Sequence, residues 1–195
     1  MNIRHADTRQ HILDTGHRLI AAKGFSGVGL SELLQASGVP KGSFYHYFKS
    51  KELFGQALLE DYFEHYLRQL DTRLATPGLP ARARLLAYFR QWRETQADDC
   101  PEQKCLVVKL AAEVSDLSEA MRLTLREGTA QVIARLAACV AAGTEDGSLP
   151  ARTAPTQMAA TLYQLWLGAS LLAKLQRDAA PLDQAWEASL QMLSN

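Results

Sequence analysis

Eight consecutive residues near the start of the chain, KGSFYHYF at 41–48, hold side chains that could bind a nucleic acid. Phe44 and Phe48 are four residues apart, so on a helix they share one face and can pack inward. The other edge offers cations, hydroxyl groups and aromatic rings, which are the groups that meet phosphates and base edges in a DNA major groove. The candidate DNA contacts on this edge are Lys41, Ser43, Tyr45, His46 and Tyr47.

The second stretch that could do chemistry is CPEQKCLVVKLAAEVSD at 100–116. Its Pro-Glu pair is typical of a helix start, which places Cys105 in the first turn of a helix. The helix N-terminus and the nearby Lys104 and Lys109 favour the thiolate, the reactive form of cysteine. The alternative is an inert buried thiol, which is the commoner fate of an intracellular cysteine.

The elements around residues 41–48 predict a helix-turn-helix at about 29–48. A short helix at about 30–36 ends at Ser37-Gly38, and Pro40 suits the first turn of the next helix. A further helix from Asp7 or Thr8 to Lys23 precedes them and should pack against them. The predicted core of this small unit is apolar and consists of Phe25, Val28, Leu30, Leu33, Val39, Phe44 and Phe48.

The string G-F-x(4)-L-x-x-L-x(4)-G-V-x-K-G-x-x-Y-x-x-F-x-S-K-E at 24–52 resembles the TetR family of transcriptional repressors. The resemblance implies a helix-turn-helix DNA-binding domain and a contact between Lys51 and the DNA backbone. A solvated surface lysine is the alternative reading of Lys51. Gly29 stands where the family usually has Thr or Ser, so its N–H can meet a phosphate but the hydroxyl contact is lost. Tyr47 stands where the family often has His.

Composition agrees with a soluble globular protein. The chain has 195 residues, of which 47% are hydrophobic and 22% charged, and its formal net charge is zero. The charge is unevenly distributed, because residues 1–51 hold seven Lys and Arg against three Asp and Glu, a net charge of +4. A local basic region of this kind fits a DNA-binding segment in an otherwise acidic chain.

No secretory segment and no apolar run of about eighteen residues occurs, so we expect a cytoplasmic protein without a membrane partner. The three cysteines are then expected to be reduced thiols. We find no Gly-rich phosphate loop and no pair of histidines at metal-ligand spacing, so no cofactor and no metal site is predicted.

Helical periods cover the rest of the chain. A long helix runs from about Ser50 to Leu74, and a Pro- and Gly-rich linker follows at 76–80. Further helices are predicted at about 81–97, 104–115, 118–142, 153–176 and 182–193. The fold class is therefore all-α with about nine helices. We expect a DNA-binding domain at 1–66 and a C-terminal domain for ligand sensing and dimerisation at 67–195.

The helix at 153–176 is apolar on nearly all sides, which predicts that it is buried on all sides. One side can face its own core, and the other should meet a second subunit together with the last helix. The family resemblance implies a four-helix bundle between two subunits. A homodimer would place two recognition helices about 34 to 36 Å apart, the spacing of successive major grooves in a palindromic operator. Core packing without dimerisation is the alternative.

Two later segments, KCLVVKLAAEVSDLSEAMR and YQLWLGASLLAK, resemble the NemR-like branch of this family, which senses reactive electrophiles. This resemblance implies a sensing cysteine at Cys105. Lys174 ends an apolar run, and a desolvated amine near Cys105 would help to ionise the thiol or condense with its oxidised form. Snorkelling of Lys174 to solvent is the alternative. Cys139 is expected in the core, whereas Cys100 lies in a predicted loop and could act as a resolving thiol.

The leading hypothesis is a homodimeric repressor that binds double-stranded operator DNA and leaves it when Cys105 reacts with an electrophile or oxidant. A second hypothesis is a repressor induced by a reversible small-molecule ligand, with Trp92, Tyr163 and Trp166 as pocket walls. A thiol enzyme is a third possibility. It is disfavoured, because no histidine follows His65 to activate the thiol.

Overall fold

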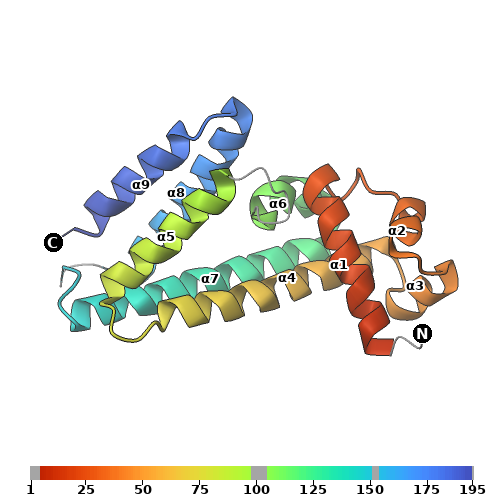
Figure 1. The fold of residues 1–195 in the computed structure, drawn as a ribbon, viewed down its shortest axis with the longest axis horizontal. Helices are drawn as coiled ribbons and strands as arrows, with labels where there is room; N and C mark the ends of the chain where they lie inside the picture. The colour runs from red at the N-terminus through yellow and green to blue at the C-terminus, as the bar shows by residue number, and fades with distance from the viewer. Residues whose placement is uncertain (1–4, 98–104, 151–153, 195) are drawn as a thin grey trace. The chain divides into compact units, whose positions relative to one another are not determined.

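The computed structural model describes residues 5–97, 105–150 and 154–194, and within these ranges all regular structure is α-helical (Figure 1). The all-α fold predicted from the helical periods is therefore confirmed. Nine helices occur in the described residues. They are α1 (His5–Lys23), α2 (Leu30–Ser37), α3 (Lys41–Tyr47), α4 (Lys51–Leu74), α5 (Ala81–Ala97), α6 (Leu106–Leu117), α7 (Glu119–Glu145), α8 (Pro155–Gln176) and α9 (Ala180–Met192).

The chain forms two compact units. The first comprises residues 1–64 and 100–127, and the second comprises residues 65–99 and 128–195. The helix α6 and the first turns of α7 thus belong to the same unit as the predicted helix-turn-helix. The domain boundary near residue 66 predicted from the sequence stays a prediction.

Around the helix-turn-helix, the core of the first unit is built from apolar faces of α1 to α4 and the turns between them. Five of the seven predicted core residues are buried, whereas Leu30 and Val39 are half-buried. Phe44 of α3 is fully buried, and its ring lies 5.4 Å from the ring of Phe48 and 5.6 Å from that of Phe54 on α4. This aromatic cluster fixes α3 by its inner face, because each ring buries a large apolar area.

The turn between α2 and α3 is closed by a left-handed glycine. Gly38 has a φ of 64°, and its N–H donates to the carbonyl of Gln35 at the end of α2. Pro40 then caps α3, and its carbonyl accepts the N–H of Ser43 at 2.9 Å. The sequence predicts Pro40 inside the first turn of α3, whereas Pro40 lies just before that turn. The missing N–H of proline costs nothing at either position.

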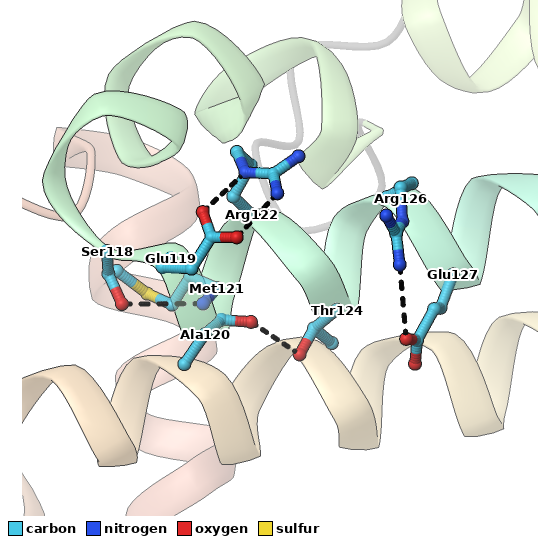
Figure 2. A network of polar contacts seen from close by, with 8 residues as sticks. All are labelled: Ser118, Glu119, Ala120, Met121, Arg122, Thr124, Arg126 and Glu127. Atoms are coloured by element: carbon cyan, nitrogen blue, oxygen red, sulfur yellow. Dashed lines mark hydrogen bonds and ion pairs between the residues drawn. The ribbon is translucent and has the colours of Figure 1, made fainter.

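The junction between α6 and α7 is a second fixed point of the first unit (Figure 2). The hydroxyl of Ser118 accepts the N–H of Met121, and Glu119 forms a double hydrogen bond at 2.6 Å with the guanidinium of Arg122. Met121 is buried, and a Cβ added at Gly55 of α4 would lie 2.4 Å from its sulfur. This close approach packs the start of α7 directly against α4.

The second unit has an aromatic core. Trp166 of α8 is fully buried and donates its indole N–H to Ser189 of α9 at 2.9 Å, and Trp92 of α5 donates to Ser170 of α8 at 3.0 Å. Each indole N–H thus has a hydrogen-bond acceptor inside the core, which removes the cost of burying it. These bonds connect α8 to both α5 and α9.

One face of α8 remains exposed in the single chain. The exposed side chains are Leu171, Leu172 and Leu175, with exposed fractions of 47%, 47% and 70%. In the isolated chain, the predicted burial of α8 on all sides therefore holds for only one face of the helix. In the described residues, no helix combines the length and apolarity that crossing a membrane requires.

Candidate functional site

The outer edge of α3 is open to solvent in the way a DNA-reading helix requires. Lys41 and His46 are exposed, Tyr45 is 40% exposed, and Ser43 and Tyr47 are half-buried. All five lie on one seven-residue helix whose inner residue, Phe44, is fully buried. The ammonium of Lys41 lies 5.9 Å from the ring centre of Tyr45, so a cation and an aromatic ring are presented together. The structure thus brings the five predicted contacts to one short surface.

Gly29 lies at the N-terminal end of α2 and is exposed. Its backbone is extended, with φ of −75° and ψ of 151°, and a Cβ added there would meet nothing within 4 Å. Glycine is therefore not required by the backbone or by packing at this position. Its N–H lies just before the first turn of α2, and a helix N-terminus of this kind can bind a phosphate.

Lys51 has an intramolecular role that the sequence did not indicate. Its ammonium donates a hydrogen bond to the carbonyl of Phe25 at 2.8 Å and lies 4.5 Å from the centre of the Phe25 ring. The side chain is half-buried rather than fully solvated. An ammonium has three N–H groups, so Lys51 can donate to Phe25 and to a phosphate at the same time. The phosphate contact stays a prediction.

Cys105 lies at the N-terminal end of α6, at the N-cap position, and is half-buried. The hydroxyl of Tyr62 from α4 donates to its sulfur at 3.8 Å. The ring of Tyr62 in turn stacks on His17 of α1, with centroids 6.2 Å apart. The thiol therefore contacts α4 through Tyr62, whose ring connects it to α1 of the same unit.

The electrostatics of Cys105 differ from the sequence-based expectation. Burial raises the pKa of the Cys105 thiol, and hydrogen bonds from the backbone of Val108, the hydroxyl of Tyr62 and the backbone of Val107 lower it by less. The predicted effect of the helix N-terminus is present, but desolvation exceeds it. The net direction is upward because the charged thiolate loses more solvation than these donors restore.

Lys109 also has a contact other than the predicted one, which was to favour the thiolate of Cys105. The ammonium of Lys109 donates to the carbonyl of Ala22 at 3.0 Å, at the end of α1. It thus binds a helix C-terminus. Lys104 and Cys100 lie outside the described residues.

The remaining cysteine and lysine lie in the second unit. Cys139 is buried, and its thiol donates to the carbonyl of Ala81 at 3.6 Å, in agreement with the predicted core position. Burial raises its pKa as well. Lys174 is exposed in the last turn of α8, which agrees with snorkelling.

The three predicted pocket residues are close together. Trp92, Tyr163 and Trp166 are all buried, with ring centroids 5.7 Å apart for Trp92 and Tyr163 and 6.1 Å apart for Trp92 and Trp166. They pack against one another in the core of the second unit. In the described residues, no cluster of His, Cys, Asp and Glu could hold a metal ion.

One residue that the sequence analysis did not single out makes a long-range polar contact in the first unit. The carboxylate of Glu113 on α6 accepts backbone N–H groups of Phe25 and Ser26, which are 88 and 87 residues away in sequence. Nothing in the local sequence identifies Glu113, because a glutamate in a helix is ordinary. Only the tertiary structure shows its partners.

Comparison with known proteins supports a regulator. Residues 12–58 match the family described as bacterial regulatory proteins, tetR family, and residues 81–189 match a tetracyclin repressor-like C-terminal domain. The chain is 46% identical over 179 residues to the HTH-type transcriptional repressor NemR of Escherichia coli K12, covering 92% of this chain and 90% of that protein. It is 35% identical to the repressor DhaR of a Mycobacterium species, over 90% of this chain and 87% of that protein.

A solved structure extends this similarity to three dimensions. The crystal structure of Escherichia coli NemR in its reduced form superposes with a TM-score of 0.89 at 46% identity, covering 94% of this chain and 95% of the other. A regulatory protein TetR from Rhodobacter sphaeroides superposes with a TM-score of 0.85 at 33% identity, covering 94% and 97% of the two chains.

Proposed function

The chain belongs to the TetR family of bacterial transcriptional regulators, and we propose that it binds a palindromic operator as a homodimer and leaves it when Cys105 reacts. It is a repressor of the NemR type, a DNA-binding regulator rather than an enzyme. The inducer in this proposal is a small electrophile or oxidant. The observation that carries the proposal is the position of Cys105, at the start of α6 and in hydrogen-bonding contact with Tyr62 of α4.

Operator recognition is assigned to the outer edge of α3. We assign Tyr45 and His46 to base edges and Lys41 to a phosphate, because cations position a protein on the DNA backbone while hydroxyl and ring groups can read bases. The exposure of these side chains supports this assignment. Replacing Lys41 by Ala should weaken binding to all sequences alike and reduce the salt dependence by about one phosphate contact. Cytoplasmic location is part of the proposal, because the operator is there.

Dimerisation is assigned to the exposed face of α8. Leu171, Leu172 and Leu175 form an apolar surface that is costly to leave in water. A second copy of the same face would cover it, and a two-fold arrangement of subunits matches a palindrome.

The sensing reaction is assigned to the sulfur of Cys105. With a quinone, the thiolate forms a C–S bond at a ring carbon, and the displaced electron pair moves to the carbonyl oxygen. That oxygen then takes a proton from solvent, which replaces the proton that the thiol lost. The added group occupies space between packed helices, because Cys105 is already half-buried beside Tyr62.

Release follows as a shift between two populations of the dimer. The modified protein favours a state in which the two recognition helices lose their matched spacing, and the long helix α4 carries the change. A coupling free energy of about 1.4 kcal/mol would lower operator affinity about tenfold.

Lys174 has no assigned step in release by a quinone. Its amine is exposed in the last turn of α8, and a role of this amine in the response to oxidants stays a prediction. Replacing Lys174 by Arg keeps the charge and removes the nucleophilic amine. The variant should respond to a quinone as the native protein does.

The deciding experiment measures binding to the DNA upstream of the gene before and after quinone or hypochlorite treatment, for the native protein and for Cys105→Ser. The proposal expects release of the native protein only. Release of both proteins would instead favour a reversible ligand, with Trp92, Tyr163 and Trp166 as candidate contacts. If neither is released, the sensing role of Cys105 is wrong.

A further inference from the structure

The turn between α1 and α2 is held by a carboxylate from α6. Oε2 of Glu113 accepts the N–H of Phe25 at 3.1 Å, and Oε1 accepts the N–H of Ser26. We call this pair of hydrogen bonds the Glu113 clamp. Both donors are backbone groups, so the clamp depends on the path of the main chain at residues 25 and 26 and not on which side chains are present there.

The same face of α6 carries a second contact with the end of α1. Lys109 lies one turn before Glu113, and its ammonium donates to the carbonyl of Ala22 at 3.0 Å. The cation therefore meets the C-terminal end of α1, while the anion meets free N–H groups that follow it. The two charges of α6 thus complement the polar groups that a helix end exposes.

The turn is shaped to receive the carboxylate. Gly24 has a φ of +83°, which is favourable for glycine, and a Cβ there would lie 2.9 Å from Oε2 of Glu113. Burial raises the pKa of Glu113, but the hydrogen bonds from Ser26 and Phe25 together lower it by more, so the net direction is downward. The carboxylate is thus held in its charged form by the turn.

The other end of α6 is Cys105. Glu113 lies eight positions after Cys105, which corresponds to about 12 Å along a helix at 1.5 Å per residue. Beyond Glu113, α6 ends at the fixed junction with α7, where Ser118 caps the next helix and Met121 packs on α4 (Figure 2). Cys105 and Glu113 thus lie along one short helix that has defined contacts near both ends.

We propose that Glu113 is the positioning residue that couples the state of Cys105 to the DNA-reading helices, through its grip on the turn between α1 and α2. The inference rests on the proposed function, and it adds a specific route within the first compact unit. In the reduced protein the clamp stabilises the DNA-binding arrangement. Displacement of α6 by an adduct at Cys105 strains or breaks the clamp, and α1 and α2 move relative to the rest of the unit.

The first test compares the native protein with Glu113→Gln, each with and without a maleimide adduct on Cys105 confirmed by mass spectrometry. The measured quantity is the ratio of operator Kd values for labelled and unlabelled protein. We expect a ratio of about tenfold or more for the native protein and about twofold or less for the variant, at equal labelling rates. An equal ratio for the two proteins would overturn the inference.

A matched control and a second variant keep this test specific. Asp116 is an exposed carboxylate on the same helix, so Asp116→Asn makes the same change of charge and should retain the native ratio. Lys109→Met removes the neighbouring contact and should reduce the ratio, which provides a test if Glu113→Gln does not fold. A purely structural role of Glu113 would lower the thermal stability of both forms while leaving the ratio unchanged.

A measurement without mutation or DNA separates this inference from the proposed function. Amide hydrogen exchange at Phe25 and Ser26, followed by NMR in the native protein, should accelerate when Cys105 carries the adduct. Unchanged exchange would overturn the coupling role of Glu113 even if the adduct releases DNA. Accelerated exchange without release from DNA would support the clamp and contradict the sensing function instead.

Discussion

The hydroxyl of Tyr62 on α4 donates a hydrogen bond at 3.8 Å to the sulfur of Cys105, the residue directly before α6. The two residues are 43 positions apart in sequence. The contact places the thiol beside the helix that begins directly after the recognition helix. It also makes Tyr62 a determinant of how readily Cys105 reacts.

Replacing Tyr62 by Phe should slow the reaction of Cys105 at neutral pH. The hydroxyl lowers the pKa of the thiol, so its loss reduces the thiolate fraction. A hydrogen bond with a net strength of about 0.5–1.5 kcal/mol corresponds to a rate about twofold to tenfold lower. Rates are measured by maleimide labelling under pseudo-first-order conditions. Tyr66→Phe is the control, because the Tyr66 hydroxyl bonds Tyr88 instead, and equal rates for Tyr62→Phe and the native protein would contradict the prediction.

The reaction of Cys105 should depend steeply on pH. Burial disfavours the charged thiolate, so the pKa of Cys105 is raised above its ordinary value and the thiol is mostly protonated at neutral pH. The labelling rate should rise about tenfold per pH unit until the pH approaches this raised pKa. The comparison is an unstructured peptide with one cysteine, whose rate should level off at lower pH. A protein curve that levels off first would show that desolvation does not dominate.

Replacing Gly29 by Ser should strengthen both the fold and operator binding. The backbone at Gly29 is extended and the space is open, so a serine hydroxyl can cap α2 and reach a phosphate. We expect a gain of about 0.5–1 kcal/mol in the free energy of unfolding, partly because serine restricts the unfolded chain.

The control for Gly29 is Gly38, where the backbone conformation does favour glycine. Gly38 has a φ of 64°, so Gly38→Ala should cost about 1 kcal/mol. Urea denaturation measures both changes, and operator titration measures the added contact of Gly29→Ser. A destabilised Gly29→Ser protein would show that the position requires glycine after all.

Replacing Leu175 by Glu should disrupt dimerisation while leaving the subunit folded. Leu175 is 70% exposed in the single chain, so the charge costs little there, but a charge buried between two subunits is expensive. The dimer dissociation constant should rise at least about tenfold, with a parallel loss of operator affinity. Sedimentation analysis measures the change. Leu79→Glu, at an exposed leucine in the linker after α4, should retain the dimer, and a Leu175→Glu dimer of native strength would exclude this face.

The local elements were predictable because their signals are local. The period of apolar residues, Gly38 at the end of α2 and Pro40 before α3 are enough to place the helix-turn-helix, since caps and turns depend on adjacent residues. The inward Phe44 and the exposed Lys41 on one short helix followed from helical spacing alone.

The environment of each functional group was decided by the tertiary structure. The helix start and the nearby lysines favour an activated Cys105, with an inert buried thiol as the alternative. In the structure, burial raises its pKa, and Lys109 instead donates to the carbonyl of Ala22. The grip of Glu113 on the turn at Phe25 joins residues 88 positions apart. Sequence periodicity determines which side of a helix is apolar, whereas desolvation and long-range hydrogen bonds depend on which helices meet, and only the folded chain specifies that.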